Sequence, residues 1–179
     1  MIEGHIADDA GCDSFSLTDI EAAVLVLEDH RYLVHRGIDF HSVLRELIRI
    51  FLRQRHGGAS TIEMQFVRTC TGFREKTVKR KLYEMLLSYI IARKFGKRRI
   101  LKSYLSCAYF GTGLEGVESA CVAHFSKASA QLMKAEALFV AATLVYPRPL
   151  VLTQKWRDKV EQRAAYGERV YCRLKSKEG

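Results

Sequence analysis

Apolar residues recur every three or four positions along almost the whole chain, and this spacing restricts the fold more than any other feature of the sequence. Residues at such intervals share one face of an α-helix, whereas a half-buried strand needs apolar and polar residues to alternate. No segment of the sequence alternates convincingly, and residues 150–153 are the one candidate for a short strand. We predict a mainly α-helical chain, with helices over residues 19–28, 40–55, 61–71, 78–95, 98–109, 117–125, 132–145 and 154–175.

Capping patterns mark several of these helix boundaries. Thr18-x-x-Glu21 and Ser60-x-x-Glu63 both have the pattern of a capping box, in which the two side chains accept backbone N–H groups at the start of a helix. Gly96 is expected to close the helix over residues 78–95. The only two prolines of the chain follow the helix over residues 132–145 and end it.

Length and composition fit one domain. At 179 residues and 48% hydrophobic, the chain is long enough for one core and short for two. We expect a single domain over residues 1–179 that ends in a basic helix, residues 154–175. No apolar run approaches the roughly 18 residues of a membrane-spanning helix, and acidic residues stand where a signal peptide would be apolar. The chain is expected to be soluble or bound peripherally to a membrane.

A formal net charge of +9 favours a polyanionic partner. Nucleic acid, an acidic membrane surface and a pyrophosphate-bearing substrate all qualify. Between residues 68 and 102 there are 12 lysines and arginines against two acidic residues, so the middle of the chain is strongly basic. The five cysteines are odd in number and form no Cys-x-x-Cys pair, which argues against a disulfide framework and against a zinc site.

The first cluster of polar residues begins at Glu28, at the end of a predicted helix. The helix dipole disfavours an ionised carboxylate at that end, which suits a general base working near neutral pH. The segment His35-x-Gly37-x-Asp39 follows as a turn with further titratable groups. A solvated glutamate at a helix end is the simpler interpretation of Glu28 taken alone.

A second cluster, Gly58-Ala59-Ser60-Thr61, precedes another predicted helix. It offers backbone N–H groups and two hydroxyls at a helix N-terminus, which is a ready site for phosphate or sugar oxygens. Gln65 follows inside that helix with a side chain able to donate and to accept. The alternative is that Ser60 only caps the helix and that the glycines only form a turn.

The third cluster lies on the helix over residues 78–95. Arg80 and Glu84 are four residues apart, so their side chains are neighbours on the helix surface. Helical rotation places Glu84 nearly opposite an apolar stripe that includes Leu82. Glu84 is then either a partner in a surface ion pair worth about 0.3 kcal/mol or a carboxylate on a cleft wall, held by Arg80 and Lys81.

In this order, the clusters resemble the motifs of the peptidoglycan glycosyltransferases, which form glycosyltransferase family 51. Within this family, the chain most resembles the monofunctional biosynthetic transglycosylases. The likeness spans about residues 17–150, the motif-bearing core of the domain. The matching segments are Glu28 to Asp39, with Tyr32 in place of a phenylalanine, Gly58 to Gln65, Arg80 to Glu84, and Tyr104 to Gly113.

The resemblance implies a fold with a lysozyme-like globular lobe beside a small hydrophobic jaw. The amphipathic helix over residues 40–55 falls where the family places that jaw, so its apolar side chains would enter the headgroup boundary while its arginines meet anionic lipids. The implied location is peripheral to the cytoplasmic membrane, on its outer face. The implied partners are lipid II, the growing glycan strand, the membrane surface and a transpeptidase, and nucleic acid is not among them.

In the family, a first-motif glutamate deprotonates the 4-hydroxyl of the acceptor sugar, which attacks C1 of the donor and expels a polyprenyl pyrophosphate. The resemblance makes Glu28 this base and Glu84 an assistant near the leaving pyrophosphate. No cofactor is obligatory, and a divalent cation, Mg²⁺ or Mn²⁺, on Glu84 is the one that the resemblance allows. The implied substrate-binding residues are Ser60, Thr61, Gln65, Arg68, Lys76, Arg80 and Lys81. The implied supports of the site are His35, Asp39 and Gly58.

The implied function is polymerisation of lipid II into glycan strands, which serves cell wall biogenesis and cell shape. Departures from the family pattern leave open a catalytically weak relative that binds lipid-linked pyrophosphate intermediates. A basic helical nucleic-acid-binding protein would explain the charge but not the Ser-Thr-Ile-x-x-Gln segment, and its affinity would collapse with salt. The departures are at Met64, Ala92, Ser106 and Glu115.

Overall fold

The structure is a computed structural model that describes residues 17–52, 58, 60–73, 75 and 77–178, without the side chains at 47, 50 and 175–178. The mainly α-helical fold predicted from the sequence is confirmed, and it is consistent with a lysozyme-like lobe. None of the described helices is both long enough and apolar enough to cross a bilayer. The elements are α1 (Asp19–Glu28), α2 (Phe40–Phe51), α3 (Ile62–Thr71), α4 (Val78–Lys94), α5 (Lys97–Cys107), β1 (Tyr109–Gly111), β2 (Leu114–Glu115), α6 (Val117–Phe125), the 3-10 helix η2 (Ser129–Gln131), α7 (Lys134–Ala142) and α8 (Gln154–Glu178).

The described chain divides into two compact units. Unit 1 comprises residues 31–104 and holds α2, α3, α4 and most of α5. Unit 2 comprises residues 17–30 and 105–178, and it holds α1, both strands and helices α6 to α8. The functional prediction of a single glycosyltransferase domain over residues 1–179 stays a prediction.

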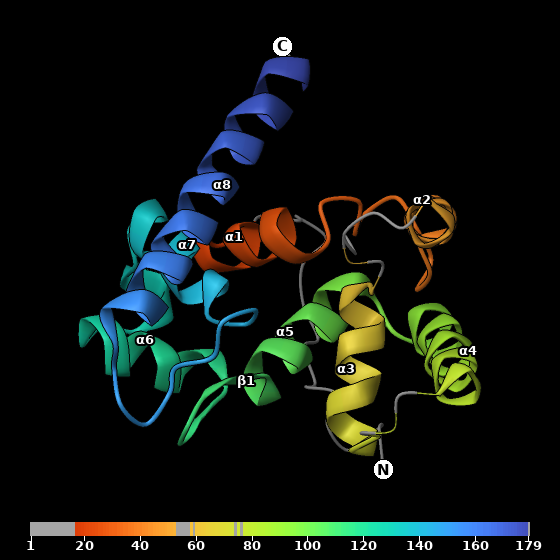
Figure 1. Ribbon diagram of the computed structural model, residues 1–179, viewed down its shortest axis with the longest axis horizontal. Helices are drawn as coiled ribbons and strands as arrows, with labels where there is room; N and C mark the ends of the chain where they lie inside the picture. Colours follow the sequence, from red (N-terminus) through yellow and green to blue (C-terminus); the bar gives the residue numbers. More distant parts are fainter. Residues whose placement is uncertain (1–16, 53–57, 59, 74, 76, 179) are drawn as a thin grey trace. The chain divides into compact units, whose positions relative to one another are not determined.

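Unit 2 is built around α1, which lies against α7 and α8 (Figure 1). The stripe predicted for α1 is buried, since Ile20, Val24 and Leu27 are at most 6% exposed. The capping box is also confirmed, because Thr18 N donates to the Glu21 carboxylate and Glu21 N donates to Thr18 Oγ1. α1 therefore begins and packs as its sequence predicts.

The long helix α8 comes close to its neighbours at Gly167. A Cβ atom at this position would lie 2.8 Å from a methyl carbon of Leu27 and 2.8 Å from one of Leu138. Such separations are shorter than carbon atoms normally reach, so a Cβ atom here would require these two leucine side chains to shift. The helix lies where the sequence places the basic C-terminal helix.

The strands β1 and β2 form a small antiparallel hairpin that the sequence analysis missed. The helix predicted over residues 98–109 ends at Cys107, and Gly111 of β1 forms a bridge with Arg148. A Cβ atom on Gly111 would lie 2.5 Å from the Cβ of Arg148, so glycine is needed at this contact. The strand considered for residues 150–153 is wrong, because those residues form no strand.

In unit 1, α3 begins one residue later than its sequence predicts. Its N-cap is Thr61, whose Oγ1 accepts the N–H of Met64 at 3.3 Å. The capping box predicted for Ser60 and Glu63 is therefore wrong. Ser60 instead accepts a hydrogen bond from Lys81, and Glu63 is completely buried.

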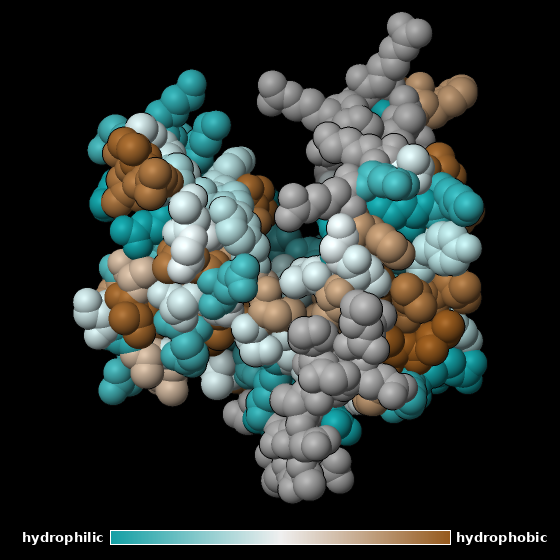
Figure 2. Space-filling model, turned by 90° about the horizontal axis from the view of Figure 1, so that it is seen from below, coloured by the Kyte–Doolittle hydropathy of each residue, from teal (hydrophilic) through white to brown (hydrophobic). Residues whose placement is uncertain are grey.

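The helix α4 turns its apolar stripe outward. Leu82 is 60% exposed and Leu86 is 55% exposed, whereas Glu84 and Ser88 are fully buried. Figure 2 shows apolar atoms on its right side, where Figure 1 places α4. The surface ion pair considered for Glu84 is wrong, because its carboxylate does not meet solvent. The helix α2 likewise exposes apolar side chains one turn apart: Phe40, Leu44, Ile48 and Phe51.

Candidate active site

In unit 1, the buried carboxylate of Glu84 lies among three cationic side chains. Arg68 binds it through two hydrogen bonds, Nε to Oε1 at 3.0 Å and Nη2 to Oε2 at 3.2 Å. Arg80 Nη1 lies 3.4 Å from Oε1, and Lys81 Nζ lies 3.7 Å from Oε2. Three cations against one carboxylate leave an excess of positive charge, which suits a polyanionic ligand.

Lys81 links this cluster to the second motif. Its Nζ donates to Ser60 Oγ at 2.9 Å. Burial lowers the pKa of Lys81 below 10.5, and the charges of Arg68 and Arg80 lower it further, although Glu84 acts in the opposite direction. The ammonium of Lys81 therefore gives up its proton more readily than an ordinary lysine does.

Thr61 links the second motif to the first. Its hydroxyl donates to the carbonyl of Gly37 at 2.7 Å. Gly37 has a φ of +86°, and a Cβ atom there would lie 2.4 Å from the carbonyl oxygen of Ser88 on α4. The turn of the first motif is thus pressed against α4, at a position that only glycine can occupy.

Asp39 and His35 hold the same turn. Asp39 accepts from Ser42 Oγ at 2.7 Å and forms an ion pair with Arg31 at 3.1 Å. Burial acts to raise the pKa of Asp39, but the hydrogen bonds from Ser42 and the charge of Arg31 outweigh it and keep the pKa below 3.8. His35 is buried beside the ring of Tyr32. The supporting role in the site for both residues stays a prediction.

The remaining predicted residues of unit 1 differ in their surroundings. Gln65 accepts a hydrogen bond from the Tyr104 hydroxyl at 2.7 Å, so the second and fourth motifs meet here. Gly58 has a φ of +59° and space around it for a side chain. Lys76 lies outside the described residues. Met64 is fully buried, so this departure from the family pattern affects core packing.

In unit 2, Glu28 is the last residue of α1, as predicted. Its side chain is 12% exposed, and Arg163 Nη2 of α8 lies 3.4 Å from its Oε1. The same nitrogen donates to the carbonyl of Leu27 at 2.6 Å. The sequence analysis missed Arg163, because 135 residues separate it from Glu28 and it stands in a generally basic segment.

A buried ion pair was also missed. Lys97 Nζ lies 2.5 Å from Oε1 of the buried Glu63, and it stands 4.1 Å above the ring of Tyr32. The Tyr32 hydroxyl donates to the backbone carbonyl of Lys97 at 2.8 Å. The tyrosine that replaces the family's phenylalanine thus gains a hydrogen bond, and this substitution was the one sequence signal for the cluster.

Comparison with known proteins gives these motifs their context. A model of the transglycosylase family matches residues 12–169. The chain belongs to this family. A Cupriavidus necator protein is 40% identical over 123 residues, 69% of this chain and 53% of that protein. The biosynthetic peptidoglycan transglycosylase of Haemophilus influenzae is 36% identical over 135 residues, 74% of this chain and 54% of the relative.

The transglycosylase relatives are longer than the region that matches them. Penicillin-binding protein 1A of Rickettsia bellii is 36% identical over 137 residues, which are 74% of this chain but 17% of that protein. The chain spans about half the length of the Cupriavidus and Haemophilus relatives. Family membership is therefore established for this region, and the similarity extends beyond the core of residues 17–150 that carries the motifs.

Proposed function

We propose that the chain is a peptidoglycan glycosyltransferase that polymerises lipid II into glycan strands and releases polyprenyl pyrophosphate. The cationic cluster around the buried Glu84 carries this proposal. Departure of a pyrophosphate develops negative charge, and prearranged cations in a site with little water stabilise such charge strongly. The carboxylate holds the three cations in place and cancels only one of their charges.

Glu28 is proposed as the general base. It takes the proton from the 4-hydroxyl of the acceptor N-acetylglucosamine, and the oxygen attacks C1 of the donor N-acetylmuramic acid. The new bond joins that oxygen to C1, and the bond between C1 and the pyrophosphate oxygen breaks. Arg163 binds the end of α1 and its contact with Glu28 fixes the direction of the carboxylate, so we assign it a positioning role.

Glu84 is proposed to act through its cations. Arg68, Arg80 and Lys81 bind the departing pyrophosphate, and the lowered pKa of Lys81 makes it a suitable proton donor to that group. Ser60, Thr61 and Gln65 are proposed to contact sugar and phosphate oxygens, and Lys76 to add to the basic field.

A divalent cation does not fit the contacts that Glu84 makes. Both carboxylate oxygens accept hydrogen bonds from Arg68, and two further cations lie within 4 Å of them. Divalent cations such as Mg²⁺ bind oxygen ligands, and the three cationic side chains would repel such an ion. We therefore assign no step to a divalent cation. Glu84 as a ligand of Mg²⁺ or Mn²⁺ stays a prediction, which polymerisation with and without a chelator tests.

The exposed apolar side chains of α2 are proposed to meet the membrane that carries lipid II. Phe51 is 87% exposed and Phe40 is 69% exposed, and both belong to the helix that the resemblance assigns to the jaw. Burying such side chains at the headgroup boundary is favourable. The proposed location is the outer face of the cytoplasmic membrane, and a transpeptidase is the proposed protein partner.

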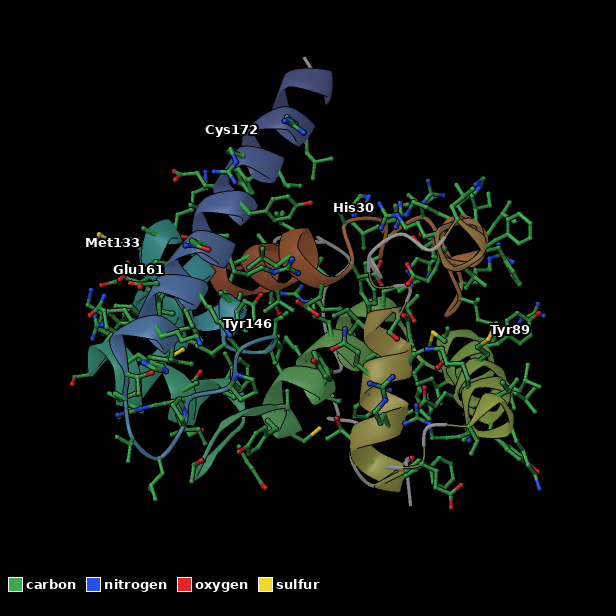
Figure 3. The ribbon with its side chains drawn as sticks, viewed as in Figure 1. His30, Tyr89, Met133, Tyr146, Glu161 and Cys172 are labelled. Atoms are coloured by element: carbon green, nitrogen blue, oxygen red, sulfur yellow. The ribbon has the colours of Figure 1, made fainter. Side chains whose placement is uncertain are left out.

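The test is incubation of the purified protein with labelled lipid II, followed by separation of the products on a gel. We expect polymer from the parent and a loss of roughly 10²- to 10⁴-fold in rate for Glu28→Gln. Glu161→Gln is the matched control, because Glu161 is an exposed glutamate of the same unit (Figure 3). Equal rates for Glu28→Gln and the parent would remove Glu28 from the mechanism. Binding of lipid II by the parent without any polymer would favour the weak relative instead.

A further inference from the structure

An open pocket of about 580 Å³ lies within unit 1, and its lining includes neither Glu84 nor the three cationic residues around it. It is lined by the turn after Tyr32 and by the junction of α4 and α5. This volume is within the range of ligand-binding pockets, roughly 300–1,000 Å³. None of the described residues that line it is acidic, and its cationic members are Arg36, Arg93 and Lys97.

The charges around the pocket favour an anion. Arg36 is exposed, and the described part of the chain gives it no ion pair. Arg93 donates to the hydroxyl of Tyr89, which is labelled in Figure 3, and lies over the same ring, so its charge is not neutralised by that contact. Lys97 is paired with Glu63. The pocket therefore keeps an excess of positive charge.

The start of α5 adds to this preference. The backbone N–H groups at a helix N-terminus favour negative charge, and cationic side chains there are unfavourable. α5 nevertheless begins with Lys97-Arg98-Arg99 and has no acidic residue in its first turn. An anion in the pocket would offset the unfavourable charges of the helix end and of the side chains together.

The apolar members of the lining indicate what the anion is attached to. Leu33 is 56% exposed and Val34 is 74% exposed, and Phe95 completes this side of the pocket. A free phosphate ion would gain nothing from these side chains, whereas hydrocarbon attached to the phosphate would cover them.

We propose that this pocket binds the phosphate of an anionic phospholipid, with the acyl chains lying along Leu33 and Val34. The proposal concerns binding alone and does not need the chain to polymerise lipid II. It also differs from the membrane contact proposed for α2, because none of the residues that line the pocket belongs to that helix.

The test is sedimentation of the protein with vesicles of phosphatidylcholine, with or without phosphatidylglycerol. We expect phosphatidylglycerol to increase the affinity of the protein for the vesicles. In the double variant Arg36→Gln with Arg93→Gln, this increase in affinity should be smaller by roughly tenfold or more. The matched control, Arg169→Gln with Arg173→Gln, removes two exposed arginines from α8 and should keep most of it. An equal loss in the control would overturn the pocket in favour of general charge attraction.

Ala92→Phe separates the shape of the pocket from its charge. Ala92 lines the pocket and is half-buried, so a larger side chain there fills space without changing any charge. We expect this variant to lose the phosphatidylglycerol-dependent gain as well, and full retention would contradict the proposal. Inorganic phosphate at constant ionic strength should compete only weakly. If phosphate alone stabilised the parent against heat but not the double arginine variant, the ligand would be a soluble phosphate and the lipid assignment would be wrong.

Discussion

The helices α1 and α4 each carry one of the two proposed glutamates, and both show a clear apolar stripe in the sequence, yet they fold in opposite ways. α1 buries its stripe against α7 and α8 and leaves Glu28 at its end. α4 exposes Leu82 and Leu86 and buries Glu84. Periodicity therefore identifies a helix but does not decide which face is inside, because three cations around Glu84 make burial of a carboxylate possible.

The largest expected effect comes from breaking the buried face of α4. Glu84→Gln leaves Arg68, Arg80 and Lys81 without their counter-charge, so we expect the free energy of unfolding to fall by about 3–5 kcal/mol. Leu82→Ala, on the exposed face of the same helix, should change it by less than about 0.5 kcal/mol. Denaturant titration measures both. A larger effect at Leu82 than at Glu84 would reverse the assignment of the two faces.

The next test makes the same substitution in the apolar stripe of each helix. Leu27→Ala in α1 removes a buried side chain and should cost about 3 kcal/mol in unfolding free energy. Leu86→Ala in α4 removes the same atoms from an exposed position, so the cost should stay below about 0.5 kcal/mol. Thermal and denaturant unfolding of the two variants compare them directly, and equal costs would show that α4 is covered in solution.

A smaller effect is expected in how the stability of each unit depends on pH. Burial, with Arg148 and Arg157 nearby, lowers the pKa of His124 in unit 2 from 6.5 to about 4. The unfolded chain binds this proton first, so the contribution of neutral His124 is complete above pH 6.5 and is lost as the pH falls toward 4. We expect a loss of about 1–2 kcal/mol across this window, after allowing for partial exposure. Asp39 in unit 1, with a pKa lowered from 3.8, loses its contribution only below that value.

His124→Phe provides the control for this pH dependence. The ring of His124 stacks on Trp156 and meets Phe139 edge-on, so phenylalanine can take its place among aromatic neighbours. Denaturant titrations of the variant over the same pH range should show a flatter profile than those of the parent. An unchanged slope would assign the acid sensitivity to another group.

The smallest effect tests the cluster around Lys97. Tyr32→Phe removes one hydrogen bond, from the hydroxyl to the Lys97 carbonyl, and keeps the ring beneath the ammonium. We expect a loss of about 1 kcal/mol in unfolding free energy. Tyr32→Leu, which also removes the ring, should cost more. No difference between the two variants would show that the ring contact contributes nothing.

The sequence predicted local features well where the chain itself contains the cause. The capping box at Thr18 and the bounds of the helix over residues 117–125 are confirmed, because both depend on neighbours within a few residues. The mainly α-helical fold and the family resemblance are confirmed as well. The roles of Glu28 and Glu84 stay predictions.

Predictions from the sequence were wrong where a residue far away in the chain determines the contacts of a side chain. Ser60 has the pattern of an N-cap, but Lys81 binds its hydroxyl and Thr61 caps α3 instead. Glu63 resembled a capping residue, and only the fold places Lys97 beside it. The strands β1 and β2 have three and two residues, which is too short for an alternating pattern to appear.

The absence of a side chain at Gly167 has a consequence one helical turn away. Arg163 lies four residues earlier on α8 and therefore shares its face. Adding a methyl group at position 167 would require the Leu27 side chain to shift, and the backbone carbonyl of Leu27 accepts a hydrogen bond from Arg163. We therefore expect Gly167→Ala to disturb the contacts around the proposed base, Glu28, although its carboxylate is still present.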